Sequence, residues 1–289
     1  MILEGILPVY YKDPLAWLRP FKGEDESVLM QHWHEIVLSA VFYAVVYKIS
    51  PVVGSFTIGK EQYRGLKYKT RINFDVHVVS MVQCIISILA IVPMWNNPMW
   101  QNRAWDHDTA VLGAYPYGGF VGAISIGYFV WDLYVCLKYL HLFGAGFLFH
   151  AFAALFVFGS TLRPFCLPWI PGFLIFELST PFVNINWFAS RVSTSKTCEK
   201  VIIVNGILLL ITFFSVRIVW GFYAVALVAA DMFATWGKVS RLFPCITLAL
   251  NLLLDILNIF WFYKMLLLAK KKGKRAPVQT ANEIADKVE

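Results

Sequence analysis

The feature that most constrains this chain is a series of long apolar runs, each about 20 residues and almost free of charge. These runs lack the alternation of apolar and polar residues that is typical of membrane barrel strands. Hydrophobic residues make up 58% of the 289 residues and charged residues only 15%, so a water-soluble core could not enclose this apolar surface. Because only helices and closed barrels satisfy the backbone in lipid, the sequence predicts an all-α, polytopic membrane protein.

About seven membrane-spanning helices are predicted from these runs, at residues 34–54, 75–95, 115–140, 143–162, 167–189, 200–222 and 244–268. The fifth is interrupted by Pro168, Pro171 and Pro181, each of which removes a helix hydrogen bond. The stretch 223–236 is apolar but short and contains Asp231. We interpret it as a re-entrant or interfacial piece, with an eighth span as the alternative.

The chain divides by composition into four regions: an amino-terminal interfacial segment (1–33), a first transmembrane helix (34–59), a main helical domain (60–270) and a basic, then polar, tail (271–289). For seven spans, the loops on the side of the tail, together with the tail, hold 15 Lys and Arg residues, against seven on the other side. The positive-inside rule therefore predicts a cytosolic carboxyl terminus. The polar stretch after Arg275 is expected to be disordered.

The distribution of charge and of His residues argues against several functions. The net charge of +7 resides mostly in membrane-flanking loops, where it sets topology and attracts anionic headgroups, so nucleic-acid binding is not expected. His32, His34 and His107 lie among acidic residues outside the predicted spans, and we expect them to be solvated rather than metal-bound. No metal-binding motif stands out, so no metal is predicted. No phosphate-binding loop or dinucleotide fingerprint occurs, so no cofactor is predicted.

Ionisable residues inside predicted spans mark candidate sites, because they are costly in lipid and face the bundle interior. A tight connection around 141–144 makes the third and fourth spans antiparallel neighbours. Asp132 and His150 then lie at one depth, roughly 10–12 Å inside the cytosolic surface. Asp132 could orient His150 as a general base or acyl-carrying nucleophile. The alternative is a structural hydrogen bond between two helices.

The fifth span carries the densest polar signal, in the segment FELSTPFVNINWF, which includes Glu177, Ser179, Asn184 and Trp187. Glu177 and Asn184 are seven residues apart and share one helical face, which should point inward. Arg217 is the only cation deep in a predicted span, and we expect it to pair with Glu177 or with Asp255 of the seventh span. His77, near the end of a span, is a further ionisable residue.

The sequence resembles the TLC-domain family, which includes ceramide synthases and the translocating-chain-associated membrane protein. The resemblance rests on ELSTPFVNINWF at 177–188, supported by the basic entry 63–71, HVVSMVQC at 77–84, YFVWDLYV around Asp132 and VRI at 216–218. It implies a six- or seven-helix bundle of the endoplasmic reticulum around a cavity that admits a lipid chain. In ceramide synthases, a pair of adjacent His residues serves acyl transfer. His150 matches the second His of that pair, but Phe149 stands where the first would be. The resemblance is therefore to the smaller, non-ceramide-synthase branch.

Three functions remain open at this stage. The first is a protein of the endoplasmic reticulum that binds lipid acyl chains and influences sphingolipid or phospholipid composition, with Glu177, Ser179, Asn184, Trp187, Arg217 and Asp255 lining a lipid cavity. The second is an acyl-CoA-dependent lipid acyltransferase with His150 and Asp132 as catalytic residues. The third is a non-catalytic helper of protein insertion or trafficking. Whether the protein is an enzyme, and which lipid it handles, are not determined by the sequence.

Overall fold

The computed structural model describes residues 9–20, 27–192 and 196–285, and within these ranges the chain is helical with no strand. Parts of the predicted interfacial segment, residues 1–8 and 21–26, lie outside the described residues. The elements are η1 (Ala16–Leu18), α1 (Val28–Thr57), α2 (Lys60–Gly65), α3 (Tyr68–Ile91), η2 (Val92–Met94), α4 (Pro98–Gln101), α5 (His107–Leu112), α6 (Pro116–Lys138), α7 (Leu140–Phe143), α8 (Ala145–Thr161), η3 (Leu167–Trp169), α9 (Ile170–Leu174), η4 (Ile175–Ser179), α10 (Thr180–Val192), α11 (Lys196–Phe213), η5 (Phe214–Val219), α12 (Trp220–Ala234) and α13 (Leu242–Ala285).

Five helical stretches of the described chain are long and apolar enough to cross a membrane. They are Val28–Thr57, Tyr68–Met94, Pro116–Lys138, Glu199–Ala234 and Leu242–Lys271. The predicted fourth span is the shorter apolar helix α8, and the predicted fifth span is the broken run from η3 to α10. The all-α membrane fold is therefore confirmed, whereas the count of seven spans is not.

Residues 223–236 form neither a re-entrant piece nor an eighth span, whereas an interfacial location for this stretch stays a prediction. The structure joins α11, η5 and α12 in one uninterrupted helix, with a π-helical turn at η5 (Phe214–Val219). The predicted sixth span and the apolar stretch after it are consecutive parts of that helix, and Asp231 lies near its end. At 1.5 Å per residue, 36 residues extend about 54 Å, well beyond the thickness of a hydrocarbon core.

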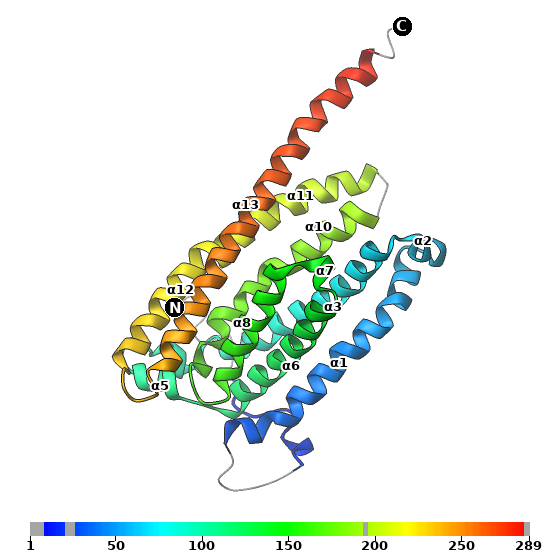
Figure 1. Ribbon diagram of the computed structural model, residues 1–289. Coiled ribbons are helices and arrows are strands. Elements are labelled where there is room, and N and C mark those ends of the chain that lie inside the picture. Colours follow the sequence, from blue (N-terminus) through cyan, green and yellow to red (C-terminus); the bar gives the residue numbers. More distant parts are fainter. Residues whose placement is uncertain (1–8, 21–26, 193–195, 286–289) are drawn as a thin grey trace.

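The carboxyl-terminal tail also differs from the expectation of disorder. Helix α13 continues without interruption from Leu242 to Ala285, 44 residues, and it projects past the other helices at one end of the bundle (Figure 1). Extending an existing helix adds one hydrogen bond per residue and needs no new nucleation step. The polar composition of the tail does not reveal this advantage, so the sequence predicted disorder.

Helix α6 packs between α1 and α8, while α10 packs against α3 and α11 (Figure 1). Glycine on α6 permits the closest approach to α1. A Cβ added at Gly127 would meet Ser39 Cβ at 2.5 Å and the Ile36 carbonyl oxygen at 2.6 Å. Ser39 Oγ donates a hydrogen bond of 2.7 Å to the Ile124 carbonyl oxygen at this crossing. Close backbone approach through small residues is the usual way that membrane helices gain packing energy.

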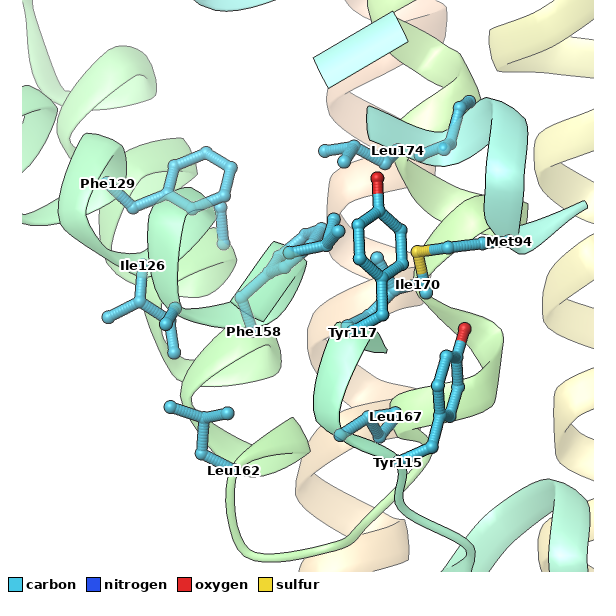
Figure 2. Close-up of a cluster of buried hydrophobic side chains, with 14 residues drawn as sticks. Met94, Tyr115, Tyr117, Ile126, Phe129, Phe158, Leu162, Leu167, Ile170 and Leu174 are labelled. Atoms are coloured by element: carbon cyan, nitrogen blue, oxygen red, sulfur yellow. The ribbon is translucent and has the colours of Figure 1, made fainter. Parts of the chain in front are cut away.

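The largest apolar cluster fills the space between α6, α8 and the segment from η3 to α9. Figure 2 shows Tyr117 and Phe129 of α6, Phe158 of α8 and Ile170 of α9 among the side chains that converge there. Gly144, with φ of +84°, precedes α8 and turns the chain back from α7, so α6 and α8 are antiparallel as predicted. This core holds the first part of the broken segment, Leu167 to Leu174, against α6 and α8.

The loops at the end of the bundle opposite α2 and α7 are tied to one another. His107 Nδ1 lies 2.8 Å from Asp231 Oδ1, and Trp169 Nε1 donates to Asp231 Oδ2 at 3.0 Å. The Arg103 guanidinium lies 5.3 Å from the centre of the Trp169 ring. Asp231 therefore joins α5, η3 and α12 at this end of the bundle.

Candidate functional site

A row of polar side chains, called the polar seam below, follows the broken segment from η4 to α10 through the bundle interior. Its members are Glu177, Ser179, Thr180 and Asn184. Its members face α3 on one side and η5 on the other, since α10 packs on α3 and η4 contacts both η5 and α3. Ser179 and Asn184 are 0% and 1% exposed, so this polar face points inward as the sequence predicted. The seam is the part of the protein where most of the predicted site residues meet.

Towards one end of the seam, Asn184 binds α3 through both ends of its amide. Asn184 Oδ1 lies 2.7 Å from His77 Nδ1, and Asn184 Nδ2 donates to Ser80 Oγ at 3.2 Å. With the amide nitrogen directed at Ser80, the carbonyl oxygen must accept a hydrogen from His77 Nδ1. The lone pair of the neutral imidazole is therefore on Nε2, which makes Nε2 a proton acceptor.

Trp187 covers the same imidazole. The two rings are stacked, with centres 4.4 Å apart and planes inclined by 26°. Phe74 and Phe188 contact Trp187 edge-on, at 6.4 Å and 5.5 Å between ring centres. His77 is thus fixed both by hydrogen bonding and by stacking, which restricts its ring to one orientation.

The basic entry 63–71 closes the bundle beside this site. Tyr63 Oη donates to Asp75 Oδ1 at 2.7 Å, and the Tyr63 ring contacts Phe74. Burial, and then the hydrogen bond to Asp75, raises the pKa of the Tyr63 hydroxyl, so it stays a neutral donor. The ring fits because Gly54 of α1 has no side chain, and a Cβ there would lie 2.4 Å from Tyr63 Cδ2.

Glu177 lies within electrostatic range of side chains on four other elements: Tyr43 of α1, Cys84 of α3, Asp132 of α6 and Arg217 of η5. Cys84 lies seven residues after His77, just as Glu177 lies seven residues before Asn184. Glu177 and Asn184 belong to successive elements, η4 and α10, and both elements pack against α3.

Arg217 is held by hydroxyl groups rather than by a carboxylate. Its Nε donates to Ser179 Oγ at 2.9 Å and its Nη2 donates to Thr180 Oγ1 at 3.2 Å. The guanidinium lies 5.3 Å from the centre of the Phe213 ring. Within the described chain no carboxylate lies within 4.0 Å of Arg217, so the expected ion pair with Glu177 or Asp255 is wrong. The broken segment, which composition cannot place in space, presents hydroxyls to Arg217 instead.

Asp132 and His150 lie on adjacent helices but are not hydrogen-bonded in the described structure. The Cys136 thiol is directed at Asp132 Oδ1 at 3.9 Å, while the His150 ring contacts Trp261 of α13 at 5.5 Å. Asp132 lies within electrostatic range of Glu177, and His150 lies within electrostatic range of Arg217. The two residues belong to one electrostatic neighbourhood without forming the predicted acid–base pair.

Asp255 belongs to the inner face of α13, with Asn251 and Asn258 one turn away on either side. All three are buried, at 1%, 5% and 3% exposure, and Asp255 Oδ2 has no hydrogen-bond partner among the described residues. Its Oδ1 faces Gly221 of α12, where an added Cβ would be 3.2 Å away. Asp255 is therefore separate from the contacts that bind Arg217.

One pocket lies between α8, the η3–α9 segment, α12 and α13. The pocket is small, with a cavity volume of about 20 Å³, which is room for about one water molecule. Its walls are mostly apolar, with Ser160, Thr161, Thr247 and Asn251 as polar members. None of Asp132, His150, Glu177 or Asn184 lines it. The expectation of one cavity lined by all four residues is not met by this pocket.

The sequence profile of the TLC domain matches residues 73–267, which include every contact of the polar seam described above except those of α1 and α2. The chain belongs to the TLC-domain family. This confirms the resemblance inferred from 177–188. No solved structure matches the chain.

Two relatives of this TLC-domain protein match nearly its whole length, and a third matches half of it. It is 36% identical to topoisomerase I damage affected protein 4 of Saccharomyces cerevisiae, over 89% of this chain and 91% of the relative. It is 34% identical to an uncharacterized TLC domain-containing protein of Schizosaccharomyces pombe, over 98% of this chain and 96% of the relative. Human TLC domain-containing protein 4 is 32% identical over 50% of this chain and 55% of the relative.

Two features of this TLC-domain protein were not found by sequence reasoning. His77 was noted only as an ionisable residue near a helix end, although its spacing from Ser80 puts both on one face of α3. The expectation that His32 and His34 are solvated is wrong, because they are 1% and 6% exposed. The amino-terminal segment folds over them, and no local pattern of α1 indicates that.

Proposed function

We propose that this TLC-domain protein binds a lipid inside its helix bundle, in the membrane of the endoplasmic reticulum, and thereby influences membrane lipid composition. The observation that carries the proposal is the environment of Arg217. This cation lies within a membrane-spanning helix, and two of its donors engage neutral hydroxyls. A guanidinium has five N–H donors, so donors remain for a phosphate or carbonyl oxygen of a lipid headgroup.

Local backbone geometry supports this assignment. Arg217 lies in the π-helical turn Phe214–Val219, and such turns occur frequently at functional sites in helices. The helix faces around the small pocket between α8, α12 and α13 are mostly apolar, as the surface that contacts an acyl chain must be. An anionic or carbonyl-bearing headgroup at Arg217 and a chain among apolar helices are consistent with one amphipathic ligand.

Lipid retention by the purified protein tests the proposal. Wild-type protein and the Arg217→Gln variant are reconstituted in nanodiscs, re-extracted, and compared by native mass spectrometry for bound lipid. We expect Arg217→Gln to lose the bound species, because the amide carries no charge. Arg163→Gln, an exposed position between α8 and η3, is the matched control. Equal lipid retention by both variants would reject lipid binding at Arg217.

Acyl transfer is the second candidate, and His77 is the observation that favours it. The imidazole is oriented by Asn184 and Trp187, and its Nε2 lone pair is suited to accept a proton from an attacking hydroxyl or amine. Incubation of purified protein with an acyl-CoA and membrane lipids, followed by measurement of free CoA, tests this candidate. We expect His77→Gln to abolish thioester turnover and His141→Gln, at an exposed position, to leave it unchanged. Wild-type protein without turnover would exclude acyl-CoA as the donor.

A further inference from the structure

Three side chains with metal-binding atoms meet where the amino-terminal segment crosses the start of α1. They are Asp13 of that segment and His32 and Glu35 of α1, and one ligand atom of each lies within 4.8 Å of the other two. His32 Nδ1 is 2.8 Å from Glu35 Oε2 and 3.9 Å from Asp13 Oδ2. The three side chains are 0–1% exposed, so the cluster is closed to solvent.

The surrounding helices aim His32 at the two carboxylates. Its other ring nitrogen, Nε2, is packed on the backbone of α6, where a Cβ added at Gly119 would lie only 2.2 Å away. Nδ1 is therefore the nitrogen directed into the cluster. Spacing of three residues places His32 and Glu35 on the same face of α1, so the helix itself brings two of the three groups together.

The charges of this cluster do not balance. Arg19 Nη2 lies 3.3 Å from Asp13 Oδ2 and compensates one carboxylate. Among the described residues, Glu35 has no cationic side chain against it: it faces the imidazoles of His32 and His34 and the carboxyl group of Asp13. Its Oε1, 3.7 Å from His34 Nε2, is a buried atom without a hydrogen-bond partner in the described structure. Two carboxylates and one guanidinium leave a negative charge in a closed site, which is costly unless a cation or proton compensates it.

We propose that Asp13, His32 and Glu35 bind a divalent transition-metal ion, with Zn²⁺ as the first choice. One imidazole nitrogen and two carboxylates form a donor set that suits Zn²⁺, and Glu35 Oε1, which has no hydrogen-bond partner in the described structure, can supply the fourth ligand. Zinc–ligand bonds of about 2.0–2.2 Å place ligand atoms roughly 3.4 Å apart, close to the observed separations. Binding uses the lone pair of His32 Nδ1, so the one proton of the neutral imidazole lies on Nε2, and any other proton held by the three groups is released to solvent. The ion then ties the segment around Asp13 to α1.

Metal analysis of the full-length protein tests this site. Protein purified in detergent without chelator, or exchanged into Zn²⁺ after chelation, is analysed by inductively coupled plasma mass spectrometry. We expect about one equivalent per chain in the wild type. We expect at least a tenfold lower content in His32→Gln and in Glu35→Gln. His141→Gln and Glu61→Gln, at exposed positions, are matched controls that should retain the ion.

A second measurement keeps the test independent of variant folding. Chelation of the wild type should lower its thermal midpoint, and added Zn²⁺ alone should restore it. Asp13→Asn, which changes the amino-terminal segment and leaves α1 intact, should melt at the same temperature with and without chelator. Wild-type protein that neither contains nor takes up Zn²⁺, or loss of the ion from the control variants as well, would overturn the proposal.

Discussion

His77 Nδ1 and Asn184 Oδ1 lie 2.7 Å apart, and their hydrogen bond joins two helices 107 residues apart in the chain. The same amide donates to Ser80 Oγ, so a single asparagine determines both the position and the tautomer of the imidazole. In a bundle surrounded by lipid, a polar side chain without a protein partner has no water to replace it. The pair therefore fixes α3 against α10 in one register.

Replacement of Asn184 tests this role in stability. Asn184→Ala removes both hydrogen bonds and leaves the His77 donor without its partner, which should lower the free energy of unfolding by about 1–3 kcal/mol. The thermal midpoint in detergent, followed by tryptophan fluorescence, measures the change. Asn186→Ala, a less buried asparagine on the same helix, should shift the midpoint much less. Equal shifts would mean that the Asn184 contacts contribute nothing specific.

Close packing of α1 on α6 leads to a second prediction. Gly127→Ala places a methyl group 2.6 Å from the Ile36 carbonyl oxygen, and this backbone atom cannot move aside without shifting α1. Such overpacking should destabilise the bundle by about 1–3 kcal/mol. Gly159→Ala on α8, where nothing lies within 4 Å of the new Cβ, is the control. The thermal midpoint of each variant in detergent measures the effect. If both variants melted at the wild-type temperature, the close approach of α6 to α1 at Gly127 would be contradicted.

His150 can be removed without breaking any hydrogen bond found in the described structure, because its ring contact is with Trp261. We therefore expect His150→Ala to accumulate at the wild-type level in cells. If His150 takes part in lipid handling, the same variant should abolish the effect of the protein on the cellular lipid profile. Lipidomics at matched expression measures this. A normal lipid profile at a normal protein level would exclude a chemical role for His150.

The asymmetry of basic loop residues predicts that the tail after Lys270 faces the cytosol. A tag at the carboxyl terminus should therefore be digested by protease added to sealed microsomes, and a tag at the amino terminus should be protected. Detergent permeabilisation should make both tags accessible, which controls for intrinsic resistance. Protection of the carboxyl-terminal tag in sealed vesicles would reverse the proposed topology.

Part of the polar seam followed from local sequence rules. The broken run 167–189 was recognised from its prolines, and the inward face of Glu177 and Asn184 from their seven-residue spacing, because helical periodicity is a local property. The antiparallel arrangement of the third and fourth spans followed from the short connection around Gly144. The contacts of Arg217 did not follow, since its hydroxyl partners Ser179 and Thr180 are nearly 40 residues away in the chain.

The sequence by itself determined that this protein is an α-helical membrane protein of the TLC-domain family, because apolar run length, loop charge and the 177–188 segment are read directly along the chain. Only the tertiary structure decided which polar groups meet: His77 with Asn184, Arg217 with two hydroxyls, and Asp13 with His32 and Glu35. A polar side chain in lipid must find a partner somewhere, but which partner depends on how the helices pack. Local composition does not encode those long-range distances.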